Sequence, residues 1–141
     1  MKRLGMLAVA AGLLILPAGL SPAAAAQPPL KIGFVGVFSG PQGALGQDMY
    51  DAFMLEVERN GGKLGGTPVE IIKKDSQLKP DVANQITDEL IEKDKVPIIA
   101  GVTFSNVMMT IYKKIVDHQV FLIGSNASPS PMAGAQCSPY D

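Results

Sequence analysis

Four short apolar runs divide the chain, and each is followed by a polar loop or a helical pattern. The runs cover residues 30–38, 67–74, 96–100 and 120–123. In the first run Ile32, Phe34 and Val35 leave neither face polar, which is typical of a strand buried on both sides of a parallel sheet. We therefore expect four strands at these positions.

Between these runs, apolar residues recur at spacings of three and four, which predicts helices. One helix is expected over residues 47–60, with the glycines after Asn60 available for a left-handed cap. A second is expected from Pro80 to about Lys93, since proline fits the first turn of a helix. A third follows Ser105, with this apolar stripe: Val107, Met108, Ile111, Tyr112, Ile115 and Val116. Residues 39–46 and 63–66 read as loop and turn.

The order of these elements is β-α-β-α-β-α-β. Such alternation predicts an α/β fold, a Rossmann-like parallel sheet with right-handed crossovers and helices on both faces. Beyond Ser128 the chain is rich in proline and shows no periodic pattern, so a loop is expected there.

The first 26 residues have the pattern of a secretory signal peptide. Lys2 and Arg3 precede an apolar stretch over residues 4–20, and an A-x-A cleavage pattern ends at Ala26. The alternative is a membrane anchor, but the apolar run is short and Pro17 interrupts it. We expect residues 27–141 to form the mature domain of an exported, periplasmic protein.

Composition and charge exclude several other classes. The 141 residues are 47% hydrophobic and 18% charged, which is a globular composition. Without Lys2 and Arg3 the chain has 10 basic and 13 acidic residues. The resulting net charge of −3 gives no support for nucleic-acid binding. The lone Cys137 either pairs with a cysteine outside this chain or is a small buried residue.

No motif for a cofactor, a metal ion or catalysis is present. Gly36, Gly40 and Gly43 are spaced G-x-x-x-G-x-x-G, unlike the dinucleotide-binding G-x-G-x-x-G, and there is no P-loop. We expect His118 to be a solvated residue at a helix end. Asp75, after the second strand, could serve as a phosphoacceptor or a ribose contact, but a structural cap is the preferred interpretation.

The stretch from Pro97 to Ala127 carries the strongest functional signal. Its two strands are followed by Thr103–Asn106, which is polar apart from Phe104, and by Gly124–Ser128, which is small and polar. Parallel strands end at one edge of the sheet, where ligands of open α/β folds bind. Ser105 is the expected N-cap of the following helix, whose first N–H groups favour an anion.

Four segments in order resemble the periplasmic substrate-binding proteins of ABC transporters, of the branched-chain amino-acid (Leu/Ile/Val-binding) type I fold. They are KIGFVGVFSGPQGALG at 31–46, ERNGGKLGG at 58–66, IIAGVTFSN at 98–106 and FLIGSNASPSP at 121–131. The resemblance covers residues 27–141. It implies that the chain is the amino-terminal part of a two-lobed protein, with a second lobe beyond Asp141.

The resemblance also implies the ligand-binding residues. Ser105 matches the serine that holds a ligand carboxylate, and Ala127 and Ser128 match the small residue and the hydroxyl after the fourth strand. Leu45 matches a position that is often aromatic in amino-acid binders. Phe104 lines the pocket or belongs to the core, and Asn106 completes the set.

The function expected from the resemblance is a monomeric, non-enzymatic receptor that needs no cofactor. It would capture a small carboxylate, a branched-chain amino acid or a hydrophobic or aromatic acid, for a membrane permease. Two alternatives remain open: a sensory domain of the same fold, and more remotely a nucleotide-dependent oxidoreductase.

Overall fold

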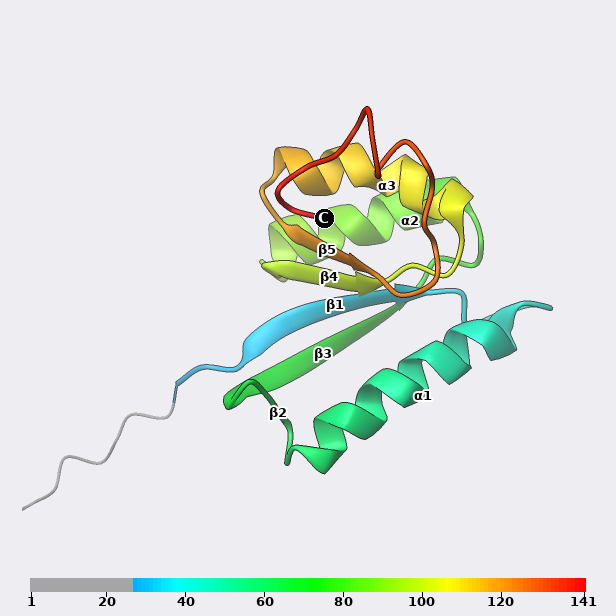
Figure 1. Cartoon of the computed structure of the whole chain (residues 1–141). Coiled ribbons are helices and arrows are strands. Elements are labelled where there is room, and N and C mark those ends of the chain that lie inside the picture. The colour runs from blue at the N-terminus through cyan, green and yellow to red at the C-terminus, as the bar shows by residue number, and fades with distance from the viewer. Residues whose placement is uncertain (1–26) are drawn as a thin grey trace, which may run out of the picture.

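A computed structural model describes residues 27–141, and it contains a five-stranded sheet with helices on both faces (Figure 1). The strands lie in the order β2-β3-β1-β4-β5. The four expected strands are β1 (Leu30–Gly36), β3 (Thr67–Asp75), β4 (Ile98–Gly101) and β5 (Phe121–Gly124), and they pair in parallel. Their carboxyl ends therefore meet at one edge, as the sequence predicted.

Helix α1 (Gly43–Arg59) covers one face of the sheet, and α2 (Pro80–Asp88) and α3 (Ser105–Asp117) cover the other (Figure 1). Each face has its own apolar core. Under α1, Phe34 is fully buried among Tyr50 and Phe53, whose ring centroids lie 5.2 and 5.4 Å from its own. The α/β architecture with helices on both faces is thus confirmed.

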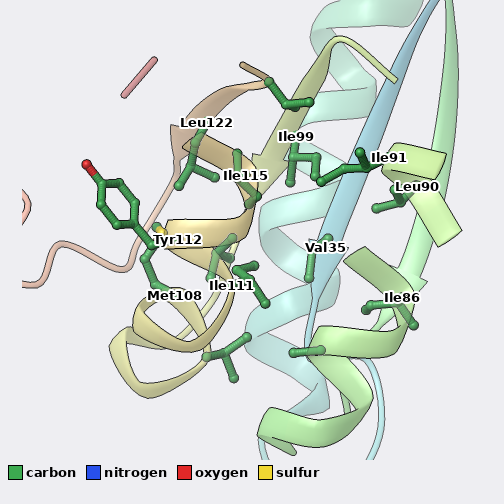
Figure 2. Packing of buried hydrophobic residues seen from close by; sticks show 14 of the residues in the cluster. Val35, Ile86, Leu90, Ile91, Ile99, Met108, Ile111, Tyr112, Ile115 and Leu122 are labelled. Atoms are coloured by element: carbon green, nitrogen blue, oxygen red, sulfur yellow. The ribbon is translucent and has the colours of Figure 1, made fainter. Parts of the chain in front are cut away.

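The larger core lies between the sheet and the pair α2 and α3. Ile99 and Leu122 reach it from the sheet, and Met108, Ile111 and Ile115 reach it from α3 (Figure 2). The stripe expected for α3 lies in or against this core, because residues three and four apart share one side of a helix.

Three strands begin or end a few residues away from the expected positions, each for a hydrogen-bonding reason. β1 stops at Gly36, because the Val37 and Phe38 amides donate to the side chains of Thr103 and Asp75 instead of to a neighbouring strand. β4 begins after Val96, because the Val96 amide donates to the Leu90 carbonyl of the preceding helical turn. β5 begins after Val120, whose amide donates to Ile115 O.

Two further local expectations were incomplete. The segment expected as a turn at 63–66 contains β2 (Lys63–Leu64), which pairs antiparallel with β3. The second helix changes at its end to the π-helical turn η1 (Glu89–Lys93). Pro80 does occupy its first turn, and Gly61 and Gly62 after α1 have the expected positive φ.

The first helix begins at Gly43, four residues before the expected start, and glycine makes this possible. A Cβ on Gly46 would lie 1.9 Å from the Val37 carbonyl oxygen. The first turn of α1 therefore packs directly against the backbone that leaves β1. The sequence looked like a loop because glycines that permit close packing and glycines that make turns cannot be told apart by composition.

Gly46→Ala is expected to lower the free energy of unfolding by about 2–4 kcal/mol, since the added methyl group forces the helix away from β1. Gly65→Ala is the matched control: Gly65 has a φ of 55° and open space around it. It should cost only about 1 kcal/mol, from backbone strain. Denaturant unfolding of both variants checks this, and equal losses would contradict the close packing described for Gly46.

The carboxy-terminal segment folds back over α3 and β5. The Tyr112 hydroxyl lies within hydrogen-bonding reach of the Gln136 carbonyl and of Asp141 Oδ2, which compete for its single proton, and the Leu122 amide donates to Tyr140 O. Burial and the neighbouring Asp141 carboxylate raise the pKa of Tyr112 to about 12. The segment expected to be an unpatterned loop is thus held by specific polar contacts.

Some apolar and reactive groups remain on the surface. Phe121 and Ile123 lie on β5, on the sheet face that packs against α1, and they are 51% and 56% exposed because the apolar cluster under α1 ends at Ile98 and Ala100 of the neighbouring β4. Cys137 is exposed, so the alternative of a small buried cysteine was wrong. Among residues 27–141 no helix is both long and apolar enough to cross a bilayer. The expected signal peptide lies outside the described residues.

Candidate functional site

The candidate site is the edge of the sheet where β1, β4 and β5 end side by side. The chain leaves β4 through Gly101 and Val102, with φ angles of 98° and 60°. A positive φ is rare for a β-branched residue such as valine. Val102 is held there by its amide, which donates to Val35 O at 2.6 Å, and by its carbonyl, which accepts from Ala127 N at 3.2 Å. These bonds fix the direction in which the chain enters α3.

Two side chains join the loops at this edge, and neither was among the expected site residues. Thr103 Oγ1 accepts a buried hydrogen bond from Val37 N at 3.1 Å, which connects the end of β1 to the β4–α3 loop. Asn126 Nδ2 donates to Thr103 O at 2.7 Å, which connects the β5 loop to the same residue. Thr103 therefore sits at the centre of three strand ends.

Ser105 lies at the start of α3, but it is not the N-cap. Phe104 takes that position, with extended backbone angles, and no described side chain forms a capping hydrogen bond there. The N-cap assignment was therefore wrong by one residue, because the extended conformation persists through Phe104. The exposed Ser105 is the first helical residue, so its hydroxyl remains available to other partners.

The first turn of α3 suits an anion. It contains no acidic residue and no side-chain cap, so its amide N–H groups face outward with the positive end of the helix dipole. The first turn of α2, by contrast, contains Asp81, which already supplies negative charge. Among residues 27–141 no cluster of three or more His, Cys, Asp or Glu side chains could hold a metal ion.

Ala127 and Ser128 follow β5 and line a cavity of about 330 Å³ beneath the carboxy-terminal segment. Ala127 is buried and Ser128 is exposed. Met108 from α3 lines the same cavity, so this space borders the helix that begins at Ser105. Sequence order alone could not show that residues 127 and 128 adjoin α3.

The remaining expected site residues are spread along the same edge. Phe104 is half-buried, which leaves both expected roles open, and Asn106 is exposed on the first turn of α3. Leu45 is 38% exposed in the first turn of α1, on the far side of β1 from α3. The topology thus places all six residues after β1, β4 and β5, with Leu45 the most separated.

Asp75 acts as the expected structural cap. Its Oδ1 accepts from Phe38 N at 2.9 Å and from Gln77 N at 2.8 Å, which ties the β1–α1 loop to the β3–α2 loop. Partial burial by itself would raise the pKa of Asp75. Hydrogen bonds from Phe38, Ser39 and Gln77, together with the Lys73 charge, instead hold its pKa below the ordinary value.

Asp75→Ala is expected to lower the free energy of unfolding by about 1–2 kcal/mol at neutral pH, because two amides lose a charged acceptor. The folded pKa is depressed, so the stabilisation by the ionised carboxylate is present above the unfolded pKa. It is lost as pH falls through the folded value. Urea unfolding should therefore show that the free energy of unfolding of the variant is well below that of the parent at pH 7 and closer to it at about pH 3.

Asp48→Ala, which removes an exposed aspartate from α1, is the control and should change stability little at either pH. If the free energies of unfolding of Asp75→Ala and the parent differed by the same amount at both pH values, the charge of Asp75 would not contribute to stability.

A second cavity, of about 260 Å³, lies between the loops that Asp75 joins. Its floor includes Val37, and its walls are residues 39–42 and 77–79. Gln77 and Leu78 have φ angles of 52° and 58°, so this wall is built from two consecutive left-handed residues. No expected site residue lines this cavity.

A family profile described as periplasmic binding protein matches residues 29–140. The chain belongs to the periplasmic binding protein family. Among curated relatives, the Leu/Ile/Val-binding protein homolog 6 of Brucella abortus is 30% identical over 115 residues, which cover 79% of this chain and 28% of the relative.

Solved structures of periplasmic binding proteins agree. An ABC transporter substrate-binding protein from Sphaerobacter thermophilus is 36% identical with a TM-score of 0.75. An ABC transporter solute-binding protein of R. palustris in complex with benzoate is 30% identical with a TM-score of 0.76. Each match covers 80% of this chain and 31% of the other chain. The chain thus spans less than a third of the length of these relatives.

Proposed function

We propose that this chain forms most of the first lobe of a solute-binding protein that captures a small carboxylate in the periplasm for an ABC transporter permease. The observation that carries the proposal is the start of α3, which is uncapped, free of acidic residues and placed where β4 and β5 end. The second lobe would lie in sequence beyond Asp141, in keeping with the greater length of the relatives.

The ligand carboxylate would bind at the first turn of α3. Amide N–H groups there donate hydrogen bonds and carry the positive end of the helix dipole, and the Ser105 hydroxyl adds a donor. Ser128 is a second hydroxyl after the neighbouring strand, and Ala127 has only a methyl group to restrict approach to the backbone. Charge-assisted hydrogen bonds of this kind are stronger than neutral ones.

The ligand class follows from the rest of the edge. Phe104 is aromatic and half-buried immediately before α3, and Leu45 is aliphatic and 38% exposed farther along the same edge, so the described lobe offers apolar side chains at that edge. The R. palustris relative was solved with benzoate. We therefore favour a hydrophobic or aromatic carboxylate, with a branched-chain amino acid as the alternative ligand.

The proposed mechanism is closure of two lobes over the ligand. A carboxylate bound to the first lobe stabilises the closed state, because only in that state does the second lobe also contact it. Such a cycle makes and breaks no covalent bond, and the closed form is what a permease would distinguish from the open form.

Ser105→Ala in the complete protein is expected to weaken binding of benzoate, or of the best ligand among aliphatic and aromatic carboxylates, by about tenfold or more. The loss reflects a hydrogen bond to a charged group. Isothermal titration calorimetry measures it. The melting temperature should stay unchanged, because the Ser105 side chain does not cap α3.

Ser130→Ala, at an exposed serine in the carboxy-terminal segment, is the matched control and should leave affinity unchanged. A panel in which no carboxylate binds would refute the proposed function. Tight binding that Ser105→Ala does not weaken would instead place the carboxylate elsewhere.

A further inference from the structure

The loops that follow β4 and β5 carry the two serine hydroxyls of the proposed carboxylate site, Ser105 and Ser128. The strands pair in parallel as far as Gly101 and Gly124, so both loops leave the sheet side by side (Figure 1). A carboxylate can use both hydroxyls only if the loops hold them at a fixed separation. The geometry of the site therefore depends on the hydrogen bonds that join one loop to the other.

Two backbone hydrogen bonds join the loops, and both lie next to the strand ends. The Ser125 amide donates to Gly101 O at 2.8 Å, and the Ala127 amide donates to Val102 O at 3.2 Å. In the part of the chain that the structure describes, no backbone hydrogen bond joins Ser128 or a later residue to the β4–α3 loop. The backbone alone therefore gives Ser128 no direct connection to the start of α3.

The side chain of Asn126 makes the connection that reaches furthest toward α3. Its Nδ2 donates to Thr103 O at 2.7 Å, one residue beyond the last carbonyl that a backbone amide of the β5 loop reaches. Thr103 lies two residues before Ser105, and Asn126 lies two residues before Ser128. Because consecutive Cα atoms are about 3.8 Å apart, the Cα of each serine lies at most about 7.6 Å from the Cα of a residue that forms this bond.

The chain on either side of this hydrogen bond is held firmly. Thr103 is 1% exposed, and its hydroxyl accepts a buried hydrogen bond from the amide that follows β1, which fixes the acceptor side. On the donor side Ala127 is buried, and Pro129 restricts Ser128 to extended backbone angles. A displacement of Asn126 is therefore carried to Ser128 and is not absorbed by a flexible loop.

Asn126 is exposed, so burial in the core does not account for its conformation. We propose that Asn126 is a positioning residue for the ligand: through Thr103 O it holds Ser128 at the distance from Ser105 that a carboxylate needs. The inference rests on the proposed function, because it takes Ser105 and Ser128 as the hydroxyls that contact the ligand. Asn126 acts through Ser128 and makes no contact of its own with the ligand.

The test measures the affinity for benzoate, or for the panel carboxylate that binds the parent most tightly, by isothermal titration calorimetry of the complete protein. Asn126→Ala should weaken binding by about three- to tenfold, because the displaced Ser128 loses part of its hydrogen bond to the carboxylate. Ser128→Ala should weaken binding at least as much. In the Ser128→Ala background, Asn126→Ala should cause no further loss, since the hydroxyl that it positions is absent.

Asn60→Ala is the matched control. Asn60 Nδ2 donates to Glu56 O at 2.7 Å, so this variant removes a hydrogen bond between the same kinds of atoms at the same distance. The bond lies at the carboxyl end of α1, whereas the ligand edge adjoins the first turn of that helix. Asn60→Ala should lower the melting temperature and leave the affinity unchanged.

Three results would contradict the inference. If Asn126→Ala left the affinity unchanged while Ser105→Ala weakened it, the positioning role would be overturned and the proposed function would stand. An equal loss from Asn126→Ala in the parent and in the Ser128→Ala background would also overturn that role, because Asn126 would then act without Ser128. If no carboxylate of the panel bound the parent, the proposed function itself would fail, and the inference with it.

Discussion

The buried hydrogen bond between the Val37 amide and the Thr103 hydroxyl is the contact on which the candidate site depends. Both residues are almost completely buried, so without the Thr103 hydroxyl no water molecule could accept the hydrogen bond of the Val37 amide. The bond ends β1 and fixes the β4–α3 loop at the same point. Asn126 then ties the β5 loop to Thr103, so three strand ends take their relative positions from one threonine.

Most of the fold could be predicted from the sequence, because its strands and helices are short, regular and clearly patterned. The buried strands are apolar on both faces, and the stripe of α3 matches its packing residue by residue. The parallel topology follows from the alternation of elements. Identification of the family then confirmed the architecture that these patterns had indicated.

The details of the edge could not be predicted, because they depend on contacts between residues far apart in the chain. Nothing local shows that Thr103 receives the Val37 amide, or that Asp75 joins two loops. The early start of α1 depends on the space between Gly46 and Val37, which composition cannot reveal. The exact start of α3 depends on the backbone angles of Phe104. The six expected site residues were placed near one edge by topology, while their contacts with a ligand remain a prediction.

The central position of β1 has a consequence for how the domain folds. The first strand of the described chain pairs with β3 on one side and with β4 on the other, so Ile32 needs both Ile71 and Ile98 before its ladder is complete. During synthesis β3 leaves the ribosome well before β4, so β1 first has β3 alone as a partner and its other edge stays unpaired. The amino-terminal half therefore holds only the β2-β3-β1 part of the sheet, and the ladder of β1 is completed when a long chain loop closes to bring β4 beside it.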